Sequence, residues 1–151
     1  TLYGNDFGLS AIPGFIKGGE YILHMVGPSC LPFNFGDSGS RMRLNTSLFW
    51  FARKTKNPAL LRNECKLLLE IPNYDYEQYR RMLPSIFVLG KDINLANLPK
   101  PKVDMFAAKN EAPVCLMRSS WKEDAIYVGI KGGKASANTH THLALGAAPA
   151  G

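Results

Sequence analysis

The sequence has few cysteines and no long apolar run, and both scarcities exclude classes of protein. Its 151 residues include only Cys30, Cys65 and Cys115, with no Cys-x-x-Cys pair, so neither a zinc finger nor a disulfide framework is indicated. No apolar stretch approaches the roughly 20 residues of a membrane span, and the first residues lack the basic and apolar pattern of a signal peptide. Glycine-rich dinucleotide and P-loop motifs are missing as well. These absences predict a chain without a membrane segment or a nucleotide site.

The chain carries a net positive charge, and its basic residues are spread along the sequence. Its formal net charge is +6; residues 1–100 carry 12 Lys and Arg against 8 Asp and Glu, and residues 101–151 carry 6 against 4. No basic stripe or run of the kind that binds nucleic acid is present. A mildly basic surface attracts an acidic polysaccharide as well as a nucleic acid. Charge alone therefore leaves both partners open.

The first half of the sequence has the apolar spacing of amphipathic helices. Proline suits a first helical turn, and Gly-Pro ends a helix. Short helices with no strands between them predict a helical array over residues 1–93. The four expected helices cover residues 11–26, a run opened by Thr46 or Ser47, a run from Pro58 to Leu69, and a short run from Tyr76 to Ile86. The Gly- and Pro-rich residues 27–43 are expected to form a loop.

The apolar period changes after about Leu89, which predicts an α+β fold. Residues 94–101 contain two prolines and are expected to be a linker, followed by an antiparallel β part over residues 102–151. Three short strands are predicted near residues 103–105, 114–116 and 126–130, the last with strict alternation. A hairpin at residues 119–124 favours antiparallel pairing. So small a sheet needs its apolar face covered by the helices or by strands from elsewhere in a parent chain.

Several short sequence motifs occur in a specific order along the chain. The second half contains Met-Arg-Ser-Ser-Trp at 117–121, a strand-like run at 124–133, and His-Thr-His at 140–142. This order resembles the start of the β-sandwich in heparinase II/III-like polysaccharide lyases. The first half contains Phe-Gly-Leu at 7–9, Pro-Gly-Phe at 13–15, Gly-Pro-Ser at 27–29 and the loop at 32–38, which look like the end of that family's toroid. The resemblance implies the last helices of an incomplete α/α toroid followed by the first strands of an antiparallel β-sandwich.

The chemistry that the resemblance implies is β-elimination on a uronic-acid-containing polysaccharide, such as a glycosaminoglycan or alginate. A base removes the C5 proton while the bond from C4 to the glycosidic oxygen breaks. Because this carbon acid is weak, the site must neutralise the uronate, position a base and protonate the leaving oxygen. In the family a toroid Tyr is the base and acid, helped by His and Asn from the toroid and by a sandwich His.

The resemblance assigns roles to few residues of this chain. His140 matches the sandwich His and is predicted to be catalytic, whereas His142 matches a His that binds zinc in some members. Asn138 and Arg118 are predicted to contact the substrate. The expected partner is an acidic polysaccharide, with no nucleic acid and no membrane, and the expected location is the periplasm or outside the cell.

The chain also departs from the family pattern. That pattern continues His-x-His-x-Asp-x-Gly, and Ala144 occupies the Asp position. The catalytic Tyr is expected before Thr1, and further zinc ligands are expected beyond the end of the chain. We therefore expect this fragment to be inactive alone and to need the remainder of the parent chain for a complete fold. No cofactor is required for the chemistry, and zinc is expected at most in the parent.

Each candidate residue has an ordinary alternative. His140 and His142 lie two positions apart and share one face of a strand, but zinc needs three or four ligands, so they also fit exposed polar residues. Asn138 fits a loop, and Arg118 near Trp121 fits a structural ion pair or a stacked group. His24 is expected to be a core histidine without a role. The alternative function is a non-catalytic carbohydrate-binding or structural module of the same fold.

Overall fold

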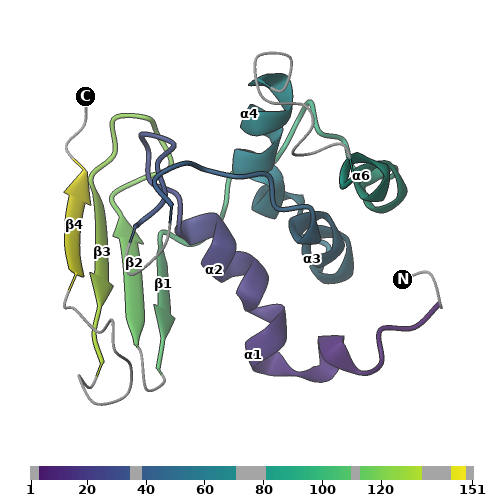
Figure 1. Ribbon diagram of the computed structural model, residues 1–151, viewed down its shortest axis with the longest axis horizontal. Helices are drawn as coiled ribbons and strands as arrows, with labels where there is room; N and C mark the ends of the chain where they lie inside the picture. The colour runs from purple at the N-terminus through teal and green to yellow at the C-terminus, as the bar shows by residue number, and fades with distance from the viewer. Residues whose placement is uncertain (1–3, 35–38, 71–80, 110–112, 134–143, 149–151) are drawn as a thin grey trace. The chain divides into compact units, whose positions relative to one another are not determined.

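The chain forms helices in its first part and an antiparallel sheet in its second, which confirms the α+β class (Figure 1). The computed structural model describes residues 4–34, 39–70, 81–109, 113–133 and 144–148. These belong to two compact units. The helical unit comprises Thr1–Leu23 and Arg43–Pro99, and the sheet unit comprises residues 24–42 and 100–151. Residues 24–42, which the sequence placed in the helical part, thus belong with the strands.

The helical unit contains short helices packed around an apolar core. None of the helices in the described ranges is long and apolar enough to cross a membrane. The core side chains include Leu48, Phe49, Leu60 and Leu61, all almost fully buried. The helices are η1 (Leu9–Ala11), α1 (Pro13–Ile16), α2 (Gly18–His24), α3 (Ser47–Thr55), η2 (Pro58–Leu61), α4 (Arg62–Glu70) and α6 (Leu83–Gly90).

The helix expected over residues 11–26 is divided into α1 and α2. Lys17 separates them, and its N–H bonds back to the carbonyls of Pro13 and Phe15 in a tightened turn. Two glycines follow, which are poor helix formers. Gly19 is required by packing, because a Cβ there would lie 2.9 Å from Cβ of Phe51 on α3. The missing side chain of Gly19 therefore allows α2 to approach α3 closely.

Two of the other helical runs begin at the expected positions, whereas α6 begins at Leu83, inside the run expected from Tyr76. Helix α3 begins at Ser47 with Thr46 as its N-cap, as expected, although Thr46 makes no side-chain capping bond. The Oδ1 of Asn45 accepts hydrogen bonds from the Ser47 N–H at 3.2 Å and from its hydroxyl at 2.6 Å. Pro58 opens η2 as expected, because its missing N–H costs nothing in a first turn. Helix α6 runs on to Gly90, beyond the expected end at Ile86, and residues 76–80 of that expected helix lie outside the described ranges.

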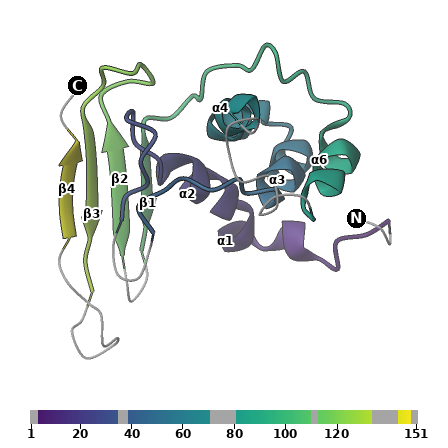
Figure 2. The same ribbon diagram turned by 45° about the horizontal axis from the view of Figure 1, so that its top comes forward.

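The sheet unit is built on one antiparallel sheet with strand order β1-β2-β3-β4 (Figure 2). The strands are β1 (Met105–Ala108), β2 (Val114–Arg118), β3 (Tyr127–Lys131) and β4 (Ala144–Ala148). The hairpin between β2 and β3 is confirmed, with Arg118 opposite Tyr127. The fourth strand was not expected, because small residues carry no strand pattern. Its pairing runs through backbone hydrogen bonds, with Lys131 opposite Ala144.

The buried face of the sheet is the one that apolar alternation disfavours. Tyr127, Gly129 and Lys131 are buried, whereas Ile126 is 62% exposed and Val128 is half-buried. Phe33, from the same unit, packs on this face so closely that a Cβ on Gly129 would lie 2.5 Å from its ring. An alternating pattern marks a strand but does not identify the face that a distant segment covers.

The opposite face, which we call the outer apolar face, is exposed along β1 and half-buried on β2 and β3 in the described part of the unit. Met105 is 53% exposed and lies opposite Met117, which lies opposite Val128. Its members from β1 to β3 are apolar without exception: Met105, Ala107, Cys115, Met117, Val128 and Ile130. Cys115, which lies on this face, is half-buried.

Candidate functional sites

Three of the four predicted site residues, Asn138, His140 and His142, lie outside the described residues. The fourth, Arg118, is the last residue of β2. Within the described ranges no group of three or more His, Cys, Asp or Glu is arranged to hold a metal ion. The roles of the His-Thr-His element therefore stay predictions.

Arg118 is buried, and its guanidinium holds the chain segment that covers the sheet. Only 9% of the residue is exposed. One terminal nitrogen, Nη2, donates to the carbonyl of Val26 at 2.8 Å and to that of His24 at 3.4 Å. The guanidinium also lies 3.7 Å from the ring centroid of Trp121, a cation–π geometry. These are the contacts of a structural side chain, and its role in substrate binding stays a prediction.

His24 completes this cluster of the sheet unit. Its carbonyl also accepts the hydroxyl of Tyr127 at 2.9 Å, and its ring packs against Trp121 with 5.3 Å between centroids. The imidazole is 3% exposed, and Nδ1 has no hydrogen-bond partner among the described residues. Burial lowers the pKa of His24 to about 4, helped by the charge of Arg118 and opposed by that of Asp104. The histidine is thus neutral at ordinary pH and serves packing.

The helical unit contains a cleft of about 990 Å³ between α3 and α6, which we call the α3–α6 cleft. Its walls combine apolar side chains, two cations and one carboxylate. Three of its residues, Trp50, Arg53 and Lys54, share one face of α3 because they are spaced i, i+3 and i+4. The lining residues are Gly4, Asn5, Asp6, Trp50, Arg53, Lys54, Pro84, Ser85, Val88 and Leu89.

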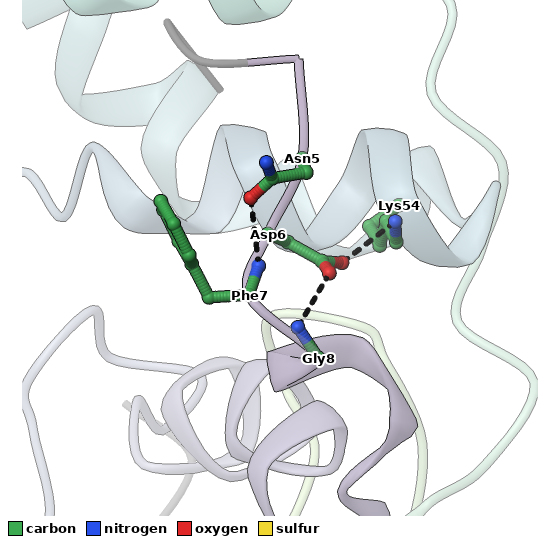
Figure 3. Close-up of polar contacts among 5 residues, drawn as sticks. All are labelled: Asn5, Asp6, Phe7, Gly8 and Lys54. Carbon is green, nitrogen blue, oxygen red and sulfur yellow. Dashed lines mark hydrogen bonds and ion pairs between the residues drawn. The ribbon is translucent and has the colours of Figure 1, made fainter.

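One wall of this cleft is fixed by Asp6 (Figure 3). Its carboxylate lies 2.7 Å from Nζ of Lys54 and accepts the N–H of Gly8 at 3.2 Å. Hydrogen bonds from Lys54 and Ser10 hold the pKa of Asp6 well below its usual range. The backbone turns sharply here, with positive φ at Phe7 and Gly8. The ionised carboxylate therefore anchors residues 4–8 to α3 over the whole ordinary pH range.

The other wall carries Trp50 and Arg53. The ring of Trp50 makes T-shaped contacts with Phe15 and Phe51, with centroids 5.8 Å and 5.1 Å away. Arg53 lies half exposed; its Nη1 donates to the carbonyl of Val88 at 3.3 Å, and its Nη2 lies 3.5 Å from Asp92. The sequence analysis missed this site, although the helical spacing of Trp50, Arg53 and Lys54 is a signal that was present in the sequence.

A buried acid lies at another place in the helical unit. Glu64 on α4 is 3% exposed, and its Oε2 accepts the N–H of Asn45 at 2.8 Å. Burial raises the pKa of Glu64 to about 7, although the hydrogen bond from Asn45 opposes the rise. Glu64 holds the loop before α3 and lines no cleft described above. Glu64 is therefore a structural group whose pKa lies well above the usual range of a carboxyl.

No protein-family model and no curated protein matches this chain.

Proposed function

We propose that this chain is part of a heparinase II/III-like polysaccharide lyase that cleaves a uronic-acid-containing polysaccharide by β-elimination. The observation that supports it most directly is the β2–β3 hairpin. Of the two runs that resemble the lyase sandwich, the one at 117–121 includes the end of β2 and the one at 124–133 contains β3. A helical unit contributes most of the preceding sequence. Helices followed by antiparallel strands are the order that the resemblance implies.

The outer apolar face supports the sandwich part of the proposal. Two sheets of a β-sandwich bury such faces against one another, about 10 Å apart. Met105, Met117 and Val128 form a row of apolar positions across three strands of this face. We infer that a second sheet of the parent protein covers it, and that the helical unit belongs to an α/α toroid.

In the proposed reaction, His140 assists from the sandwich side of the substrate cleft. The base takes the C5 proton, the electron pair released forms the C4–C5 double bond, and the glycosidic oxygen leaves C4 and is protonated. Negative charge grows on the uronate carboxylate, so donors must be positioned beside it. Asn138 and Arg118 are the candidates in this chain. No residue here matches the Tyr base, so the parent must supply it and the chain alone is inactive.

Zinc has no part in this reaction. His142 is a zinc ligand only in a parent that supplies further ligands, because a structural zinc site needs four. The partner is an acidic polysaccharide, which places the parent in the periplasm or outside the cell.

The test is a lyase assay of the intact parent on heparin, alginate and chondroitin-type polysaccharides. The unsaturated uronate product absorbs in the ultraviolet, so absorbance should rise with at least one substrate. His140→Gln should lower the rate by roughly 10²-fold or more, as loss of an acid–base group does. Lys17→Gln, an exposed residue of the helical unit, is the matched control and should change nothing. No absorbance rise with any of the three substrates would refute the lyase.

A non-catalytic carbohydrate-binding or structural module of the same fold is the second candidate. The observation that favours it is Ala144, the first residue of β4, which occupies the position of the family's Asp. Affinity electrophoresis in gels that contain each polysaccharide distinguishes the non-catalytic module from the lyase. Retardation without unsaturated product supports the module, and product formation refutes it.

A further inference from the structure

The α3–α6 cleft has the shape and wall chemistry of a small-ligand site. Such sites are concave, mainly apolar and supplied with a few fixed polar groups. Trp50, Pro84, Val88 and Leu89 provide apolar walls here, and the cleft volume of about 990 Å³ accommodates a sugar ring or two. Trp50 makes T-shaped contacts with Phe15 and Phe51, so its orientation is set before any ligand arrives. A rigid aromatic ring is a suitable surface for the C–H face of a pyranose.

The exposed guanidinium of Arg53 favours an acidic ligand of the cleft over a neutral one. Two cations and one carboxylate line it. Lys54 is paired with Asp6 at 2.7 Å, whereas Arg53 has only the longer contacts to Val88 and Asp92 in the described ranges. A guanidinium offers five N–H donors in a fork that fits a carboxylate. Arg53 therefore retains the donors needed to bind one.

We propose that the α3–α6 cleft binds a sugar unit of an acidic polysaccharide, with the ring of Trp50 against the sugar and the guanidinium of Arg53 against its carboxylate. The choice of polysaccharide rests on the proposed function. The cleft lies wholly within the helical unit and contains none of the residues assigned to the reaction. It binds the polymer without taking part in the cleavage. Asp6 and Lys54 are positioning residues that fix the wall at residues 4–8.

The test is calorimetric titration of the 151-residue chain with mannuronate tetrasaccharide and, separately, with cellotetraose. The acidic sugar should bind more tightly. Trp50→Leu should weaken binding of both sugars about tenfold, because the stacking surface is lost. Arg53→Gln should weaken only the acidic sugar, also about tenfold. Lys17→Gln removes the same charge from an exposed residue of the same unit outside the cleft, and should bind both sugars like the unaltered chain.

Two outcomes would refute sugar binding in the α3–α6 cleft. In one, Trp50→Leu and Arg53→Gln bind the acidic sugar as tightly as the unaltered chain. In the other, Lys17→Gln weakens binding as much as Arg53→Gln, which indicates attraction by net charge alone. If circular dichroism shows Trp50→Leu to be unfolded, the comparison of Arg53→Gln with Lys17→Gln decides, because both side chains are exposed.

The lyase assay separates this proposal from the proposed function. A parent without lyase activity, whose chain binds the tetrasaccharide through Trp50 and Arg53, refutes the lyase and supports the cleft. An active parent whose Arg53→Gln variant keeps its KM, and whose chain binds the tetrasaccharide unchanged, refutes the cleft and supports the lyase.

Discussion

Glu64→Gln is predicted to stabilise the helical unit at neutral and alkaline pH. Burial raises the pKa of this carboxyl from 4.5 to about 7, so between these two pH values the fold retains a proton that the unfolded chain has already lost, and above them the fold holds a buried charge. Stability from Glu64 is thus fully present below pH 4.5 and is lost as pH rises through about 7. The difference between the two pKa values corresponds to about 3 kcal/mol.

The glutamine variant removes the charge while preserving the geometry. Its amide has nearly the same size, and its carbonyl oxygen can still accept the N–H of Asn45. We expect the variant and the unaltered chain to have similar free energies of unfolding near pH 4. Near pH 8 the variant should be more stable by up to about 3 kcal/mol.

The assay is urea denaturation followed by the helical circular dichroism signal at several pH values. Only the difference between the two proteins is used, because His24 titrates too and makes stability rise with pH as its proton is lost. Glu20→Gln on α2 is the matched control, since Glu20 is exposed, and its difference should be near zero at every pH. A constant offset for Glu64→Gln, or an advantage that shrinks as pH rises, would refute the reasoning.

Three further predictions follow from the packing. Arg118→Met should cost about 2–4 kcal/mol in urea denaturation, because buried carbonyls lose a charged donor; equal stability would contradict its structural role. Gly129→Ala should cost about 1–3 kcal/mol through collision with Phe33, and Phe33→Leu should recover part of this in a double-mutant cycle, whereas simple additivity would argue against the collision. Asp6→Asn should speed hydrogen exchange of the Gly8 amide, and an unchanged rate would show that Lys54 does not fix this turn.

The helix and strand content could largely be predicted from the sequence, because it depends on local signals. Pro58 opens a helical turn, and the hairpin between β2 and β3 follows from two alternating runs with a polar connection. The division at Lys17 was not predicted, because the apolar spacing continues across it. Strand β4 was missed since alanine and glycine carry no β signal.

The candidate sites depend more strongly on distant contacts. The sequence could not tell which face of β3 is buried, because Phe33 decides that from almost a hundred positions away. Stacking of Arg118 on Trp121 was among the alternatives considered, yet its bonds to the carbonyls of His24 and Val26 required the fold. The α3–α6 cleft could not be predicted, because it forms only where α6 and residues 4–6 pack beside α3, and no local pattern encodes that packing.

The way residues 24–33 cover the sheet has a consequence for how the chain folds. Arg118 bonds a carbonyl 94 positions earlier, and Tyr127 bonds the same carbonyl across 103 positions. Contacts of such long range close late, because the loop entropy is lost before they form. During synthesis, residues 43–99 can collapse locally, whereas residues 24–33 can pack on the sheet only after β3 has emerged from the ribosome. A chain stopped before Tyr127 would therefore expose Phe33 and be prone to aggregate.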